Sequence, residues 1–507
     1  MLPDNFVGLR RGRPLLRVIF LLAMAVAAAA PPAHAGLADA VRYAKLKNGL
    51  QALVLENHKA PVATFTVFYR VGSRNEQFGM TGISHLCEHL MFRGTKKLKP
   101  EEFSNIIQNS GGEDNAFTTE DYTGYFEVIN HDHLGVPIAL EADRMANFAP
   151  QGFDSEKAVV MEERRLRTDD SPEDALQEMT QAAAYVAHPY HWPVIGWMNE
   201  IRFITLADAM RYHQVYYSPQ NAVIVAVGDF DGAKVMDQIS AAFGGIANGP
   251  KPPPVTEVEP PQTGERDVTL RHAANLPAVA EAFHVPNFEK PGDAFALEIA
   301  SEILSDGKSS RLYKDLVQDK QMVVEVGADY DMTSFDPGLF WLSAQLRPGV
   351  KSAAVLAEFD LQVAALRDHQ VSARELQKAK NLEQADFVFG QDSIFREAML
   401  LGLYQMLGNY RMIDQYLPQI DKVTAADVQR VARAYLVDGN RTVGVLVPTG
   451  VLPHEMAGGA GGTVHHTAEF APAAPPPRAI LPAPPAALAP LRAARQSALL
   501  NAAEAVR

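Results

Sequence analysis

Apolar residues recur along the chain in two different patterns, and each pattern predicts a different kind of element. Short runs rich in apolar, aromatic and β-branched residues at positions 51–55 and 63–69 indicate strands. Longer stretches at positions 297–304 and 372–388 repeat their apolar residues with the spacing of a helix. This mixture predicts an α+β fold in which helices pack on one face of a sheet.

One part of this pattern occurs twice. Residues 204–208 match residues 423–427, and each copy predicts a helix that begins at a threonine cap, then a turn and an apolar strand. The strands are expected at residues 222–227 and 442–447. The same spacing relates three further pairs, which are Arg211 and Arg430, Tyr216 and Tyr435, and Asn221 and Asn440. A gapless match across three elements favours two duplicated α+β domains, whose sheets we expect to be mainly antiparallel.

The first 35 residues have the pattern of a cleavable signal peptide. Four arginines among residues 10–17 precede an apolar run at residues 18–30, which is short for a membrane span. Ala33-His34-Ala35 fits the small residues of a cleavage site. We therefore expect cleavage after Ala35 and an exported protein, periplasmic or secreted, with no membrane span afterwards. The alternative is an uncleaved membrane anchor.

Proline-rich segments separate the two domains from each other and from the end of the chain. Consecutive prolines between residues 249 and 262 cannot continue a helix or an inner strand, so an extended linker is expected there. From residue 451 the chain becomes rich in alanine and proline, which is typical of disorder. The expected organisation is a signal peptide at 1–35, a first domain at 36–248, the linker at 249–262, a second domain at 263–450 and a disordered tail at 451–507.

Composition and charge exclude several classes of function. Apolar residues make up 47% of the chain, which is enough to build sizeable cores. The net charge of −14 disfavours nucleic-acid binding through a broad basic face. Cys87 is the only cysteine, so a metal site must use histidine and carboxylate side chains, and Cys87 itself is expected to be a packed apolar residue.

The strongest chemical signal is the segment His85-Leu-Cys-Glu88-His89. On a helix with about 100° per residue, His85, Glu88 and His89 share one face. Two histidines one turn apart can bind one Zn²⁺, and the neighbouring glutamate can take a proton from a water that attacks a carbonyl. The opposite face is apolar and consists of Leu86, Cys87, Leu90 and Met91. The alternative is a solvated amphipathic helix with two incidental histidines.

This HxxEH segment is the inverted zincin motif, and its surroundings resemble the pitrilysin/insulinase metallopeptidases, which include the mitochondrial processing peptidases. The resemblance extends over roughly residues 42–450 and includes the duplication. Four segments besides the motif carry it, at residues 71–76, 92–95, 111–118 and 156–163. It implies that the first domain is a catalytic zinc-binding peptidase domain, with one Zn²⁺ per chain, that cleaves peptides or small unfolded proteins.

The resemblance also implies a role for individual residues. The metal ligands of the family correspond to His85, His89 and Glu163, and its general base corresponds to Glu88. Glu156 lies two helical turns before Glu163 and is expected to orient a metal ligand from behind.

Two glutamates stand side by side where the third ligand is expected. Glu162 should point about 100° away from Glu163 on a helix, so we expect Glu162 to be solvated or salt-bridged. The alternative is a register that differs by one residue, in which Glu162 binds the metal.

The segment Asn115, Ala116, Phe117 and Thr118 resembles the edge strand that binds substrate in this family. An exposed strand edge can pair with an extended peptide through main-chain hydrogen bonds and lay it across the metal. The alternative is an ordinary hairpin strand.

The second domain lacks the metal motif and is expected to be non-catalytic. Glu298 and Glu302 stand where the two histidines would be. In many relatives this domain supplies an arginine and a tyrosine that hold the substrate backbone, here called the Arg/Tyr clamp, but Val317 and Val324 occupy these positions. The resemblance therefore implies a heterodimer with a paralogous subunit that carries the clamp. A homodimer that holds substrate by the edge strand alone is the alternative.

Two other functions remain compatible with the sequence. One is a non-catalytic subunit of a peptidase-like heterodimer, and the other is a zinc-dependent binding or scaffold protein. The set of His85, Glu88, His89 and Glu163 favours the enzyme, because a non-catalytic relative is expected to lose one of these residues.

Overall fold

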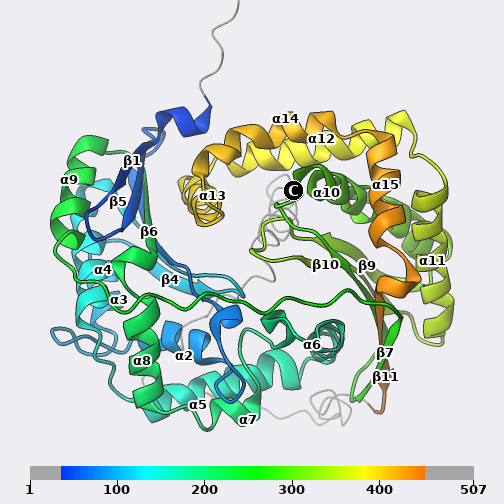
Figure 1. Ribbon diagram of the computed structural model, residues 1–507, viewed down its shortest axis with the longest axis horizontal. Coiled ribbons are helices and arrows are strands. Elements are labelled where there is room, and N and C mark those ends of the chain that lie inside the picture. The colour runs from blue at the N-terminus through cyan, green and yellow to red at the C-terminus, as the bar shows by residue number, and fades with distance from the viewer. Residues whose placement is uncertain (1–35, 451–507) are drawn as a thin grey trace, which may run out of the picture.

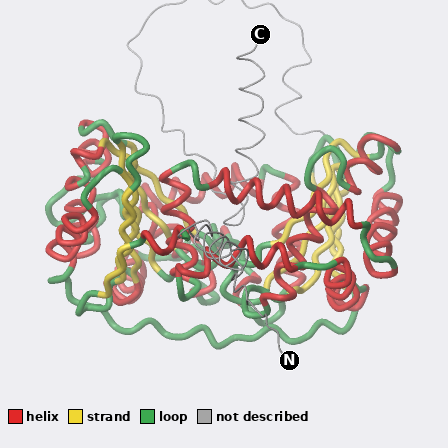
Figure 2. Tube along the Cα trace, turned by 90° about the horizontal axis from the view of Figure 1, so that it is seen from above, coloured by secondary structure: helices red, strands yellow, loops and turns green. Residues whose placement is uncertain are grey.

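The computed structural model describes residues 36–450. These residues form two halves, each built on its own β-sheet, with helices between the sheets and outside them (Figure 1; Figure 2). The predicted signal peptide at 1–35 and the predicted tail at 451–507 lie outside the described residues. Within 36–450, no helix combines the length and the apolar character needed to cross a bilayer.

The first sheet has six strands, which are β1 (Arg42–Lys45), β2 (Gln51–Glu56), β3 (Val62–Tyr69), β4 (Glu113–Thr118), β5 (Thr123–Asn130) and β6 (Ala222–Gly228). Their order across the sheet is β1-β2-β6-β3-β5-β4. Neighbours run antiparallel except β2 and β6, which are parallel. Every residue of β6 is buried, which fits its continuous apolar sequence and its place inside the sheet. β4 forms one edge.

Helices of the first half cover one face of this sheet. Ile224 and Ala226 of β6 pack with them, whereas Val223, Val225 and Val227 point to the other face, as the alternation of a strand requires. The helices are α2 (Ile83–Leu90), α3 (Glu102–Asn109), α4 (Gly135–Asn147), α5 (Phe153–Arg164), α7 (Met198–Ile201), α8 (Leu206–Tyr216) and α9 (Gly232–Phe243).

The second sheet has five strands, which are β7 (Arg266–His272), β8 (Ala278–Val285), β9 (Val323–Tyr330), β10 (Gly338–Leu346) and β11 (Arg441–Pro448). Their order is β7-β11-β8-β10-β9, with β7 and β11 parallel and the other pairs antiparallel. This repeats the order β2-β6-β3-β5-β4 of the first sheet. The predicted fold class is therefore confirmed: two duplicated α+β units with mainly antiparallel sheets.

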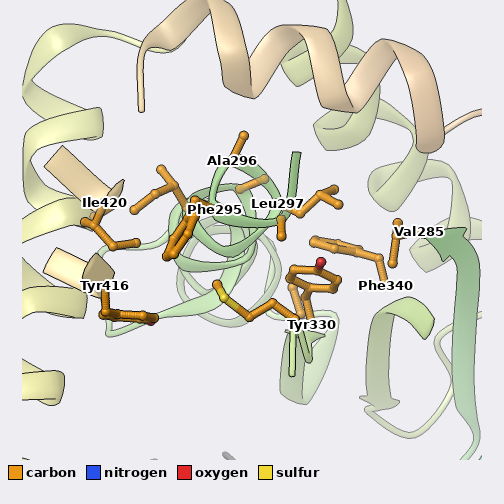
Figure 3. Packing of buried hydrophobic residues seen from close by; sticks show 14 of the residues in the cluster. Val285, Phe295, Ala296, Leu297, Tyr330, Phe340, Tyr416 and Ile420 are labelled. Carbon is orange, nitrogen blue, oxygen red and sulfur yellow. The ribbon is translucent and has the colours of Figure 1, made fainter. Parts of the chain in front are cut away.

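The helices of the second half are α10 (Pro291–Ser305), α11 (Ser352–Asp368), α12 (Ala373–Gly390), α13 (Ile394–Met406), α14 (Tyr416–Lys422) and α15 (Ala425–Tyr435). In the core of this half, α10 lies between the sheet and α14, and its side chains meet residues of both. Figure 3 shows Phe295, Ala296 and Leu297 of α10 between Val285, Tyr330 and Phe340 on one side and Tyr416 and Ile420 on the other.

The duplicated helices α8 and α15 begin at the two predicted threonine caps. The Thr205 hydroxyl accepts a hydrogen bond from the backbone N–H of Asp208, and the Thr424 hydroxyl accepts one from Asp427. Each aspartate also accepts a bond from the N–H of its threonine, so both ends form a reciprocal capping box. The strands that follow lie where the sequence predicts them.

The two halves exchange one helix each. Helix α6 (Pro172–Ala184) belongs to the first half but packs on β7, β8 and β11 of the second sheet. Helix α13 belongs to the second half but packs on β3 and β6 of the first sheet. Glycine permits both approaches: a Cβ atom on Gly402 of α13 would lie 2.1 Å from the Phe68 ring, and one on Gly444 of β11 would lie 2.1 Å from the Thr180 hydroxyl. Each sheet thus carries its own helices on one face and a helix of the other half on the opposite face.

The predicted linker contains no helix or strand between residues 249 and 262, and it runs as a long loop from one half to the other (Figure 2). It is anchored near its end, where the Glu259 carboxylate accepts hydrogen bonds from the backbone N–H groups of Val186, Ala187 and His188. The strands of the first sheet precede this segment in the sequence, and the strands of the second sheet follow it. The domain boundaries themselves stay predictions.

Candidate metal centre

Helix α2 is anchored by its apolar face and by an acidic cap. Leu86, Cys87 and Leu90 are buried in the core of the first half, as predicted for the face opposite the histidines. Glu76 is 5% exposed, and its carboxyl oxygens accept hydrogen bonds of 2.8 Å from the backbone N–H groups of Gly82 and Ser84. These two hydrogen bonds satisfy donors of the first turn that have no partner within the helix.

Three side chains converge beside α2. His85, His89 and Glu163 each offer one ligand atom, and these atoms lie within 4.8 Å of one another. Glu163 Oε2 lies 3.2 Å from His89 Nε2, and Glu163 Oε1 lies 3.7 Å from His85 Nε2. Glu163 Oε2 is buried and makes no hydrogen bond of good geometry. Two imidazole nitrogens and one carboxylate oxygen around one point are the protein donors of a catalytic Zn²⁺ site, so these residues fit the ion.

A second carboxylate lies behind one of the histidines. Glu156 Oε1 is 2.9 Å from His89 Nδ1, and Glu156 Oε2 is 3.3 Å from Arg93 Nε. A carboxylate at Nδ1 keeps the proton on that nitrogen and leaves Nε2 to bind a metal. Glu162, by contrast, points away from the centre: it is 55% exposed and pairs with Arg165. The structure thus brings Glu156 and Glu163 to the histidines and leaves Glu162 outside.

Glu88 lies against the edge strand of the sheet. Its side chain is 9% exposed, and Glu88 Oε2 accepts a hydrogen bond of 2.5 Å from the Thr118 hydroxyl on β4. Burial raises the pKa of Glu88 to about 7, against the opposing effects of His89 and of the Thr118 hydrogen bond. A carboxyl group whose pKa lies near neutral pH can both accept and return a proton.

The two histidines have opposite electrostatic surroundings. Burial lowers the pKa of His85 to about 3, and the charge on His89 adds to this. Burial also lowers the pKa of His89, but the adjacent carboxylates of Glu156 and Glu163 outweigh that effect and raise the pKa to about 10. Burial raises the pKa of Glu163, yet His89, His85 and Arg167 together hold it at about 2. The centre therefore holds an ionised Glu163 and a neutral His85.

Strand β4 has a free edge at which its main chain, more than its side chains, is available for hydrogen bonding. It pairs with β5 on one side, and no other described strand pairs with it on the other. Phe117 and Thr118 are buried, Phe117 against Phe68, whereas Asn115 and Ala116 are half-buried. Of the four residues predicted to bind substrate, Thr118 holds Glu88 with its side chain, a contact that no sequence pattern indicated.

In the second half, the place that corresponds to the candidate metal centre of the first half holds three carboxylates. Glu298 and Glu302 of α10, together with Glu383 of α12, have oxygens within 4.8 Å of one another. Helix α10 takes the place of α2, and α12 that of α5. At the two predicted clamp positions, Val317 packs against the core and Val324 is 43% exposed on β9.

Sequence comparison relates the chain to known peptidases. A family profile described as insulinase (peptidase family M16) matches residues 52–196, and one described as the peptidase M16 inactive domain matches residues 204–383. A protein of Helicobacter pylori named zinc protease PqqE is 36% identical over 411 residues, which is 80% of this chain and 92% of that protein. An uncharacterized zinc protease of Streptomyces coelicolor is 28% identical over 410 residues, or 78% of this chain and 87% of that protein.

Solved structures show the same architecture. The crystal structure of a protease from Helicobacter pylori superposes with a TM-score of 0.78 at 34% identity and covers 80% of this chain and 99% of that one. The structure of a peptidase M16 inactive domain from Pseudomonas fluorescens superposes with a TM-score of 0.71 at 17% identity and covers 81% of this chain and 98% of that one. The second likeness concerns the fold alone.

Proposed function

The chain belongs to the insulinase family of peptidases (family M16), and from this premise we propose that it is a zinc-dependent endopeptidase that cleaves peptides or small unfolded proteins. The observation that carries the proposal is the convergence of His85, His89 and Glu163 beside Glu88. Relatives named zinc proteases support it.

Each residue then has a defined task in hydrolysis. Bound Zn²⁺ would supply a Lewis acid and lower the pKa of a water molecule. Glu88 removes the proton of the attacking water while the water oxygen bonds to the scissile carbon, and later returns that proton to the leaving amine as the C–N bond breaks. Thr118 fixes the carboxyl group of Glu88, and Glu156 fixes the ring of His89. The substrate lies extended along the free edge of β4.

The test is the substitution Glu88→Gln. This variant keeps all three metal ligands, so it should bind zinc as the wild type does, while cleavage of an unfolded peptide falls by roughly 10²–10⁴-fold. A chelator should abolish wild-type cleavage, and added Zn²⁺ should restore it. Glu162→Gln is the matched control, because that glutamate is exposed and paired away from the centre. Wild-type turnover by Glu88→Gln at equal zinc content would contradict the assignment.

A paralogous subunit completes the enzyme in this proposal. Val317 and Val324 cannot donate hydrogen bonds to a substrate backbone, so a partner chain with the Arg/Tyr clamp should raise activity. The purified chain is assayed alone and then with such a paralogue. Full activity of the lone chain, unchanged by the paralogue, would instead support a homodimer. Cleavage by the pair that survives Glu88→Gln would make this chain the non-catalytic subunit.

The proposed compartment is the periplasm or the exterior. The segment at 1–35 supports it, and sequencing the amino terminus of the exported protein tests it, with Gly36 expected as the first residue.

A further inference from the structure

An arginine lies directly on the metal centre. Arg167 Nη1 is 2.8 Å from Glu163 Oε1, so its guanidinium group borders a carboxylate that faces both histidines. The Arg167 side chain is 31% exposed, whereas Glu163 and His85 are 9% and 8% exposed. Arg167 is therefore the more solvent-accessible member of this ion pair.

Arg167 follows Glu163 by one helical turn, at a spacing that places both side chains on the same face. Helix α5 passes into a wider π-helical turn over Arg165–Asp169, where the N–H of Asp170 bonds to the carbonyl of Arg165. Such turns are frequent at functional sites. Arg164 makes two hydrogen bonds to Glu178, of 2.9 and 2.8 Å, and Arg165 pairs with Glu162. Of the three arginines in this segment, Arg167 alone contacts a predicted metal ligand.

The guanidinium group of Arg167 can serve more than one acceptor. A guanidinium group has five N–H donors in a planar fork, so one group can bond to a carboxylate and to a substrate oxygen together.

We propose that Arg167 is a catalytic residue whose guanidinium group contacts the scissile carbonyl oxygen of the substrate and stabilises the negative charge that develops there. This rests on the proposed peptidase function. Val317 and Val324 of the second half carry no polar donor, so Arg167 is a guanidinium group that this chain itself brings to the zinc-binding half, separate from any clamp that a partner supplies. Preorganised donors at a developing oxyanion are among the largest contributions to catalysis.

The role of Arg167 in the reaction is electrostatic. As the water oxygen bonds to the carbonyl carbon, the π electrons of the carbonyl move to its oxygen, and the N–H groups of Arg167 donate to that oxygen. When the C=O bond re-forms, the C–N bond breaks and the amine leaves with the proton from Glu88. Arg167 keeps its own protons throughout.

The alternative is that Arg167 only positions Glu163. The zinc content of an Arg167 variant distinguishes this positioning role from the proposed catalytic role. We expect Arg167→Gln to keep full zinc after dialysis and to lose about 10²–10³-fold in kcat with little change in KM, because the contact forms in the transition state. Arg167→Lys keeps the positive charge but not the planar fork of donors. Its kcat should therefore lie between those of the wild type and Arg167→Gln. Arg165→Gln removes a neighbouring arginine that contacts only Glu162 among the residues of this segment and should match the wild type.

A binding measurement gives a readout independent of turnover. A phosphinic peptide carries a tetrahedral anion where the scissile carbonyl would be, so Arg167→Gln should weaken its binding by the same factor as kcat. Binding of the parent peptide should be unchanged when Arg167→Gln is combined with Glu88→Gln. If Arg167→Gln folds poorly, Arg167→Lys carries the same comparison.

Three results would overturn the proposal. They are zinc loss in proportion to lost activity, unchanged kcat in Arg167→Gln, and equal affinity of wild type and variant for the phosphinic peptide. A wild-type protein without chelator-sensitive cleavage would instead overturn the proposed function itself, and with it the catalytic role of Arg167.

Discussion

At the scale of single residues, two adjacent glutamates have opposite surroundings. Glu163 is 9% exposed and faces both histidines, whereas Glu162 is 55% exposed and pairs with Arg165. Glu163→Gln should weaken zinc binding by at least tenfold, because a neutral amide is a poor ligand for Zn²⁺. Glu162→Gln should retain zinc as the wild type does. Zinc content after dialysis measures both, and the reverse order would move the ligand by one residue.

Glu76 predicts a dependence of stability on pH. Burial raises the pKa of Glu76 to about 8, even though the N–H groups of Ser84 and Gly82 oppose this. The folded protein thus binds the proton more tightly than the unfolded chain does. This contribution to stability is therefore complete below the pKa of 4.5 that is usual for a glutamate, and it is lost as the pH rises to about 8. Glu76→Gln removes the titration and should flatten the curve.

The measurement is urea unfolding at several pH values between 5 and 8. The free energy of unfolding of the wild type should fall more steeply with rising pH than that of Glu76→Gln, by at most about 1.4 kcal/mol per pH unit. Glu257→Gln, at an exposed residue of the linker, should follow the wild type. Equal slopes for wild type and Glu76→Gln would contradict the assignment.

Site residues could be predicted from the sequence where their positions follow from the geometry of one helix or from the family resemblance. His85, Glu88 and His89 share a face because of helical spacing, and Glu163 came from a motif. The contacts of Thr118 with Glu88 and of Arg167 with Glu163 were missed. Thr118 meets Glu88 only because β4 packs beside α2, which no local pattern encodes. Arg167 follows Glu163 by one helical turn, and that spacing is the signal that could have indicated it. The metal-binding and catalytic roles stay predictions.

At the scale of elements, existence and type were predictable, whereas placement was not. The run at 63–69 became β3 at Val62–Tyr69, and the stretch at 372–388 became α12 at Ala373–Gly390. Apolar periodicity and threonine caps are local properties, so they survive in the fold. The exchange of α6 and α13 was missed, because an apolar helix face does not reveal which sheet it will cover.

The close packing of α13 on the first sheet predicts the effect of a substitution in this helix on stability. Glycine in a helix ordinarily costs up to about 1 kcal/mol relative to alanine, but a Cβ atom on Gly402 would lie 2.1 Å from the Phe68 ring. Gly402→Ala should therefore lower the free energy of unfolding by about 1–3 kcal/mol, measured by urea denaturation. Gly292→Ala in α10, where a Cβ atom meets nothing within 4 Å, should leave stability unchanged or slightly higher. Stabilisation by Gly402→Ala would refute the close approach.

At the scale of the whole molecule, an ionic network joins the two halves. Arg74 Nε lies 3.3 Å from Asp121 Oδ1 in the first half, and Arg74 also pairs with Asp336 in the second. Tyr190 donates a hydrogen bond of 2.7 Å to Asp121, and the N–H of Phe335 donates one of 2.9 Å to the same carboxylate. One buried carboxylate thus receives donors from both halves.

Removing the arginine should loosen this contact between the halves. Arg74 is 15% exposed, and Arg74→Ala leaves Asp121 without its arginine and Asp336 with His188 alone, which should cost about 3 kcal/mol of unfolding free energy. Arg211→Ala breaks a pair whose arginine is 68% exposed and should cost less than about 1 kcal/mol. Urea unfolding measures both, and equal losses would show that the buried network contributes no more than a surface pair.

The exchanged helices also set the order in which the protein can mature during its synthesis. Strand β6 ends at residue 228, but α13, which covers its inner face, begins at residue 394. At 5–20 residues per second a ribosome needs on the order of 10–30 s for that interval. Throughout it, Phe68, Val223 and Val225 face water, and α6 has been made before the sheet that receives it exists. The inner face of the first sheet therefore stays uncovered until α13 has been made, whereas α6 is ready before the second sheet forms.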